Sequence, residues 1–163
     1  MRLYFKEQQK FNQWWLWVPM ILFALFILYG LYQQVILGHS FGDHPLSNSG
    51  LVGFLVFVMA LMLFFWSIKM TTEINEESIR IRYFPFSSRI IKWQEIKSAK
   101  VLNYGFVGGW GIRFKTKFGT VYNTRGNLGL ALELTNGKKL CIGTQKVDEM
   151  ISVINQARKE LKL

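Results

Sequence analysis

The stretch WWLWVPMILFALFILYGLYQQVIL, residues 14–37, contains no charged side chain, and neither does LVGFLVFVMALMLFFWSI, residues 51–68. A helix needs about 20 apolar residues to cross the roughly 30 Å hydrocarbon core of a bilayer, and both stretches approach that length. A helix also satisfies its backbone hydrogen bonds internally, as lipid requires. The two stretches therefore predict a membrane protein built on a hairpin of two transmembrane helices.

The first apolar stretch is expected to stay in the protein as a membrane anchor. A basic segment with Arg2, Lys6 and Lys10 precedes it, as in a signal peptide. The apolar core of a signal peptide, however, spans roughly 7–15 residues and ends at a cleavage site made of small residues. The stretch here is longer, and its end, 33–37, offers no such site.

The positions of lysine and arginine predict the orientation of the hairpin. The connecting segment 38–50 has neither, whereas basic residues lie before the first stretch and after the second. Lysine and arginine are enriched on the cytoplasmic flanks of membrane spans. We therefore expect a multi-pass protein with a cytoplasmic N-terminal segment, 1–13, a short external loop, 38–50, and a cytoplasmic domain, 69–163.

The positive charge of the chain belongs mainly to the cytoplasmic domain. The whole chain has a net charge of +10, and residues 69–163 contain 17 basic and 8 acidic side chains, a difference of nine. A basic domain beside a membrane gains roughly 1 kcal/mol for each Lys or Arg that comes close to anionic lipid. Nucleic acid is the other common partner of a basic domain. Tethering to a membrane argues against it, so we expect no nucleic-acid partner.

The cytoplasmic domain is expected to be all-β, because the hydrophobic pattern changes there to a period of two. SIRIRY, 78–83, alternates apolar residues with arginines, and IRFKTK, 112–117, alternates in the same way with three bases. Such alternation is typical of strands with one buried and one exposed face. Further candidate strands are 70–74, 89–93, 96–103, 121–124, 130–134 and 139–142. Seven or eight short antiparallel strands predict a barrel or a sandwich.

One amphipathic helix is predicted at the C-terminus, over 146–162. Its apolar stripe consists of Val147, Met150, Ile151, Ile154 and Leu161. Thr144 is placed to cap the start, and acidic residues at the start and basic residues at the end suit the helix dipole. We expect the stripe to pack on an open end of the barrel.

The sequence also predicts the register of the last hairpin. Asn136-Gly137 usually indicates a two-residue turn, which would put the apolar residues of the second strand on the face of Glu133. A three-residue loop, 135–137, shifts the pairing by one, so that Leu132 lies opposite Leu140 and Glu133 opposite Lys139. This register requires a left-handed backbone at Gly137, which glycine adopts at little cost.

The domain resembles the bacterial PH-like (pleckstrin-homology-like) domains. The likeness is carried by GWGIR at 109–113, VY at 121–122 with Gly126 and Gly129, LxLxL at 130–134, NGKK at 136–139 and IGTQ at 142–145. It covers about 60% of the chain. The resemblance implies a barrel of about seven antiparallel strands capped by a C-terminal helix, in a protein of the bacterial cytoplasmic (inner) membrane. PH-like domains bind lipids, bind proteins or form oligomers, so the family alone does not decide the function.

We expect no cofactor, no metal and no enzymatic activity. The glycine-rich segment 105–111 suggests a phosphate-binding loop, but such a loop leads into a helix, and a strand is expected here. His39, Asp43 and His44 have metal-ligand side chains, but are expected to be solvated loop residues. Cys141 is the only cysteine, which excludes an internal disulfide, and it is expected in the core.

The candidate binding residues are the bases on two predicted strands: Arg80, Arg82, Arg113, Lys115 and Lys117. They form either solvated outer faces or contacts for anionic lipid headgroups or for an acidic cytoplasmic or membrane protein.

Two functions follow from these candidates. One is a non-enzymatic, membrane-anchored module that recruits or scaffolds a protein or lipid at the cytoplasmic face. The other is an enzyme or transporter accessory component, with ligand chemistry in Gly105–Gly111 or between the spans. Neither span contains an ionisable residue, the usual mark of a transport pathway, which favours the first function. A homo-oligomer is compatible with both.

Overall fold

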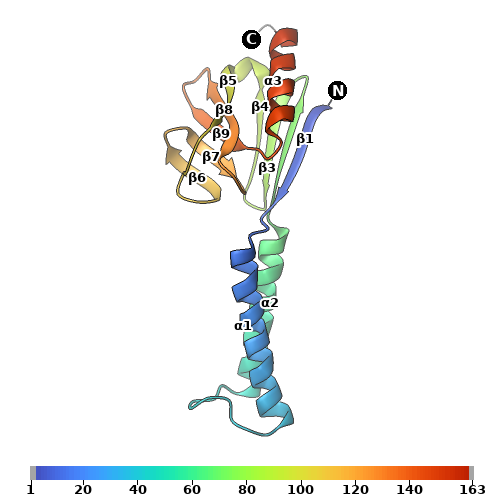
Figure 1. Cartoon of the computed structure of the whole chain (residues 1–163), viewed down its shortest axis with the longest axis vertical. Helices are drawn as coiled ribbons and strands as arrows, with labels where there is room; N and C mark the ends of the chain where they lie inside the picture. Colours follow the sequence, from blue (N-terminus) through green and yellow to red (C-terminus); the bar gives the residue numbers. More distant parts are fainter. Residues whose placement is uncertain (1–2, 162–163) are drawn as a thin grey trace. The chain divides into compact units, whose positions relative to one another are not determined.

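The computed structural model describes residues 3–161 and divides the chain into two compact units (Figure 1). One unit is the helical segment Asn12–Ser67. The other is a β-domain, which combines the chain up to Phe11 with the chain from Ile68 onward. The segment 1–13, which was predicted to be separate from the domain, contributes a strand to it, so the domain takes strands from both sides of the helical unit.

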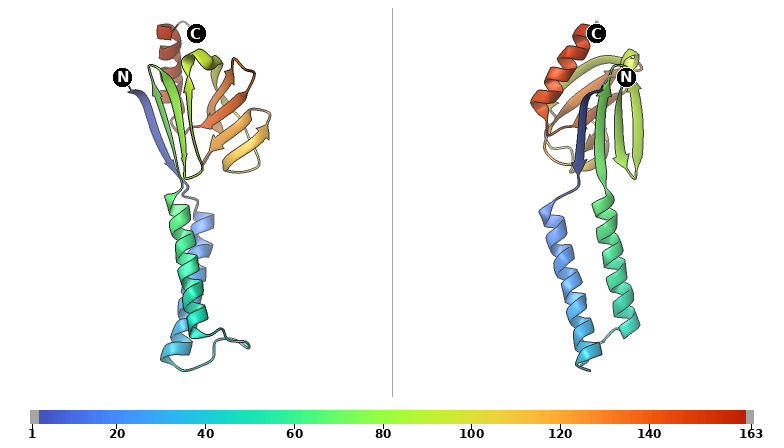
Figure 2. Two further views of the ribbon diagram at one scale, coloured as in Figure 1. Left: turned by 180° about the vertical axis from the view of Figure 1, so that it is seen from behind. Right: turned by 90° about the vertical axis from the view of Figure 1, so that its right-hand side faces the viewer.

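The two apolar stretches form long helices that pack side by side (Figure 2). α1 spans Trp14–Leu31 and continues as a π-helical turn, Tyr32–Ile36, and α2 spans Asn48–Ser67. By length and composition both helices could cross a membrane. Their 23 and 20 residues reach about 34 and 30 Å at 1.5 Å per residue. The buried contact between the helices consists of Ala24, Ile27, Leu51 and Val58.

The first sheet of the domain has the strand order β1-β2-β3-β4, with every pair antiparallel. Its strands are β1 Leu3–Lys10, β2 Lys69–Asn75, β3 Ser78–Phe84 and β4 Ser87–Lys92. β1 was not among the predicted strands; it precedes α1 and pairs with β2 as far as Lys10 opposite Lys69. Both chain connections to the helical unit therefore leave from one end of this sheet.

The second sheet has the order β5-β8-β9-β7-β6. A 3-10 turn, Trp93–Glu95, leads into β5 Ile96–Asn103, and β6 Gly111–Thr116, β7 Gly119–Asn123, β8 Leu128–Leu134 and β9 Lys139–Gly143 follow. β7 and β9 pair in parallel, whereas only antiparallel pairs were predicted. This pairing depends on Gly119, where an added Cβ would lie 1.9 Å from the carbonyl oxygen of Lys139.

The prediction of a barrel of about seven antiparallel strands is wrong in strand number and in closure. Within residues 3–161 the domain has nine strands in two separate sheets. The ninth comes from the segment ahead of α1, and the edge strands β1 and β5 are bridged by a helix instead of by hydrogen bonds between strands.

The predicted register of the last hairpin is confirmed. Leu132 pairs with Leu140 and Glu133 with Lys139. The N–H of Gly137 donates to the carbonyl oxygen of Leu134 at 2.9 Å, which closes the three-residue loop. Gly137 has a φ of 79°, as this loop requires.

The C-terminal helix, α3 Val147–Leu161, contacts β1, β5 and β8 (Figure 1). Its buried residues are Met150, Val153, Ile154 and Ala157. The predicted stripe is wrong at Ile151, which is 41% exposed. The buried face of the helix runs through Val153 and Ala157 instead. The side chain of Leu161 lies outside the described residues.

Candidate functional site

Arg80 and Arg82 lie on the outer face of the first sheet, as the alternation along β3 predicts. The residues between and beside them, Ile79, Ile81 and Tyr83, are buried. Arg80 is paired with Glu73, which forms an ion pair with Lys6 at 2.8 Å. The hydrogen bond from Lys6, together with the charges of Lys6, Arg80 and Arg82, lowers the pKa of Glu73. Arg80 is half-buried in this row and Arg82 is exposed, so Arg82 is the more accessible base.

The strict alternation predicted for residues 112–117 is wrong, because β6 contains a bulge. Arg113 pairs with Val121 and Thr116 with Gly119, so β6 has one more residue between these pairs than β7 has. The extra residue is accommodated by a left-handed backbone at Lys115, with a φ of 57°. As a result Phe114, expected on the buried face, is 69% exposed.

The five candidate bases therefore do not form one surface. Arg80 and Arg82 belong to the first sheet, and the other three belong to β6, an edge strand of the second. Lys115 and Lys117 are exposed. Arg113 turns back on the glycine-rich segment, where its Nη2 donates to the carbonyl oxygen of Trp110 at 3.1 Å.

The glycine-rich segment connects β5 to β6 and so leads into a strand, as predicted. Positive φ angles occur at Gly105, Gly108, Gly109 and Gly111. With Asn123, Gly126 and Asn127 the segment lines an open pocket of about 260 Å³. No ionisable side chain is among the described residues that line it, so the pocket offers shape and amide groups but no acid or base.

Tyr83 links the first sheet to this pocket. Its hydroxyl donates to the carbonyl oxygen of Asn123 at 3.4 Å. Burial raises the pKa of Tyr83 to about 12, and the nearby charge of Arg113 opposes that shift. The Asn123 side chain in turn accepts a hydrogen bond from the backbone N–H of Gly111 at 3.0 Å.

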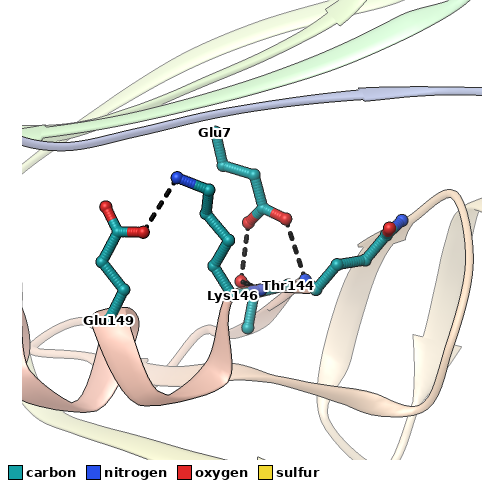
Figure 3. A network of polar contacts seen from close by, with 5 residues as sticks. Glu7, Thr144, Lys146 and Glu149 are labelled. Atoms are coloured by element: carbon teal, nitrogen blue, oxygen red, sulfur yellow. Dashed lines mark hydrogen bonds and ion pairs between the residues drawn. The ribbon is translucent and has the colours of Figure 1, made fainter.

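A buried carboxylate joins β1 to the start of α3 (Figure 3). Glu7 is 5% exposed. Its Oε2 accepts a hydrogen bond from Oγ1 of Thr144 at 2.6 Å, and its Oε1 accepts one from the backbone N–H of Gln145 at 2.8 Å. Oγ1 of Thr144 also accepts from the N–H of Lys146 at 3.0 Å, which supports the turn into α3. Thr144, the predicted capping residue, thus also donates a hydrogen bond to Glu7, which was not predicted.

Gln9 makes the second polar connection of β1. Its Nε2 donates to the carbonyl oxygen of Gly143 at 2.9 Å, and its Oε1 accepts from Oγ1 of Thr124 at 2.6 Å. Glu7 and Gln9 thus use their buried polar atoms to hold β1 against the ends of β7 and β9 and against the turn into α3. We call these two residues and their partners the polar seam.

Cys141 is buried in the core, as expected. Burial raises the pKa of its thiol to about 12, which makes it a poor nucleophile. Among residues 3–161, no three His, Cys, Asp or Glu side chains come together as a metal site requires. His39, Asp43 and His44 are exposed in the segment between α1 and α2.

Comparison with known proteins reveals no relative of this chain: no family model, no curated protein and no solved structure matches it. The proposals below therefore rest on the geometry and chemistry of its own residues.

Proposed function

We propose that this chain is a multi-pass protein of a bacterial cytoplasmic membrane with both termini on the cytoplasmic side. Its β-domain acts there as a non-enzymatic, PH-like module that recruits or scaffolds a protein or anionic lipid. The observation that carries the proposal is the pairing of β1 with β2 across the helical unit. A hairpin that crosses a membrane twice returns its two flanks to the same side, where they are free to form one sheet.

The distribution of basic residues supports the cytoplasmic side for the domain. The segment 38–50 contains no Lys or Arg, whereas the domain contains most of the positive charge. This is the bias found on the cytoplasmic flanks of membrane spans. The two sheets and the C-terminal helix support a PH-like module, while the added β1 and the parallel β7–β9 pair depart from the expected pattern.

The use of the buried polar groups supports a non-enzymatic role. Both oxygens of Glu7 are occupied by Thr144 and Gln145. The thiol of Cys141 is buried and held in its protonated form. The groups most suited to catalysis thus serve the packing of the domain.

The outer face of the first sheet supports recruitment of an acidic partner. Arg82 is exposed there beside Arg80, and two rows of this face carry Lys6 and Lys10. Exposed charges of one sign attract an oppositely charged partner over roughly 8–10 Å at physiological salt.

Charge reversal in native membranes tests this function. Tagged full-length chain is purified from gently solubilised membranes, and the proteins and lipids that accompany it are quantified by mass spectrometry. Arg82→Glu is expected to lose the partner, whereas the matched control Lys138→Glu, which reverses another exposed base, in the last hairpin, is expected to keep it. An unchanged set of partners in both variants would contradict recruitment through this face. Release of the chain from membranes by alkaline carbonate would contradict the anchor itself.

A further inference from the structure

Five aromatic side chains of the β-domain are strongly exposed, and they come from two short segments. Phe84 and Phe86 are 46% and 58% exposed, and Phe106, Trp110 and Phe114 are 89%, 38% and 69% exposed. Every other Phe, Tyr and Trp described for this domain is buried or half-buried. A gathering of exposed apolar side chains marks an interaction surface.

Both segments lie at the end of the domain from which the chain connects to α1 and α2. The last row of the first sheet consists of Lys10, Lys69 and Phe84. Tyr83, next to Phe84, is hydrogen-bonded to Asn123, which accepts the N–H at the start of β6. The β3–β4 turn and the glycine-rich segment therefore border the same row. We call this region, with Phe84, Phe86, Phe106 and Trp110, the aromatic end.

The covalent connection to α2 leaves the domain directly from its aromatic end. Only Ile68 separates Ser67, the last residue of α2, from Lys69, the first residue of β2. At ~3.8 Å per Cα step, the Cα atoms of Ser67 and Lys69 are at most about 8 Å apart. Trp14 and Trp66, at these ends of α1 and α2, are exposed, and tryptophan is enriched at membrane–water interfaces.

The aromatic end is also basic. Lys10, Lys69 and Arg125 are exposed there. The segments 84–86, 104–111 and 123–128 contain no Asp or Glu. Glu76 and Glu77 lie between β2 and β3, at the opposite end of the first sheet. The charge of this end thus matches an anionic surface.

We propose that the aromatic end is seated in the headgroup layer of the bilayer that α1 and α2 span, with Lys10, Lys69 and Arg125 against anionic headgroups. The inference rests on the membrane anchoring in the proposed function and identifies the lipid surface as the partner of this end. Trp110 is favourable at the headgroup level because its indole joins an apolar ring to a polar N–H, and the phenylalanine rings of the same end gain by leaving water for the apolar part of that layer. Basic side chains beside the rings add attraction to anionic lipid, which salt weakens.

A fluorophore sensitive to water and to lipid-borne quenchers tests the seating. The full-length chain is used, because β1 lies ahead of α1 and the domain is incomplete without it. Phe106→Cys carries the label, and Glu76→Cys is the matched control at the opposite end, with Cys141 protected by burial. In vesicles of zwitterionic and anionic phospholipids, we expect a blue-shifted emission and quenching by headgroup-proximal quenchers at position 106, and neither at position 76. High salt, or vesicles without anionic lipid, should weaken the quenching at position 106.

The outcomes separate this inference from the proposed function. If the chain resists alkaline extraction but the label at position 106 is as exposed to water as the label at position 76, the seating is overturned and the anchor is left intact. A chain released by alkali would overturn both. In native membranes, a photoreactive residue at position 106 should capture lipid, and capture of a protein in its place would overturn the seating as well.

Discussion

Replacing Glu7 with alanine is expected to destabilise the β-domain by about 2–4 kcal/mol. The substitution removes the acceptor of two short hydrogen bonds, from Thr144 Oγ1 at 2.6 Å and from the N–H of Gln145 at 2.8 Å. Each donor left without a partner in a buried place costs about 1–3 kcal/mol. Part of this cost is offset, because the substitution also removes the desolvation penalty of the buried carboxylate.

The alkylation rate of Cys141 measures this loss in the full-length chain. Cys141 is the only cysteine, and it is buried, so a maleimide reaches it only when the domain opens. When closing is faster than alkylation, the rate reports the population of the open form. Because 1.4 kcal/mol corresponds to a factor of ten, Glu7→Ala should be labelled about 30- to 700-fold faster than the unchanged chain.

Glu149→Ala is the matched control for this measurement. Glu149 is a carboxylate of the first turn of α3, but it forms an exposed ion pair with Lys146 at 2.8 Å (Figure 3). An exposed pair contributes about 0–1 kcal/mol, so labelling should rise at most about fivefold. Equal labelling of Glu7→Ala and the unchanged chain, or labelling of Glu149→Ala as fast as Glu7→Ala, would refute the role of the polar seam.

Three further predictions use other parts of the chain. Gly137→Val should accelerate Cys141 labelling more than Asn136→Ala, because valine is strained at a φ of 79°; the opposite order would contradict the loop. A cysteine at Ser47 should react with an impermeant maleimide added outside the cell and one at Ser152 should not, and the reverse would invert the topology. Tyr83 has a folded pKa of about 12 against 10 unfolded, so its contribution to stability is complete below about pH 10 and is lost as the pH rises towards 12. Denaturant unfolding should therefore show a weaker alkaline loss of stability in Tyr83→Phe, and an unchanged loss would exclude Tyr83 as a cause.

The two apolar helices and the last hairpin were predictable because one physical constraint dominates each. Eighteen or more consecutive residues without charge leave few alternatives to a long apolar helix. In the hairpin, a shift of one residue would move Leu140 and Ile142 to the face that carries Glu133 and Lys139. Burial therefore selects the register, even though the Asn136-Gly137 pair alone favours a different turn.

β1 could not be predicted, because its inward-facing residues do not look like core residues. Only Phe5 among them is apolar, and Glu7 and Gln9 face inward with it. The groups that satisfy them are far away in sequence: Thr144 lies 137 residues from Glu7, and Thr124 lies 115 residues from Gln9. The bulge in β6 was not predicted for a related reason, since the extra residue is defined only by the pairing with β7.

The candidate bases on β3 were found by alternation, and the same rule applied further along the strand would have placed Phe84, one residue of the aromatic end, on the same face. If Ile79, Ile81 and Tyr83 face the core, Phe84 must share the outer face with Arg82. A phenylalanine on the solvent-facing side of a strand is unexpected in a soluble domain. In a domain whose strand β2 begins one residue after a helix that is long and apolar enough to cross a membrane, lipid is a second environment for an apolar side chain. Hydrophobicity alone does not tell whether such a side chain faces the solvent or the lipid. The pairing of Phe84 with Lys69 supports the proposed lipid contact, because it places Phe84 in the row of the sheet that the chain connects directly to α2.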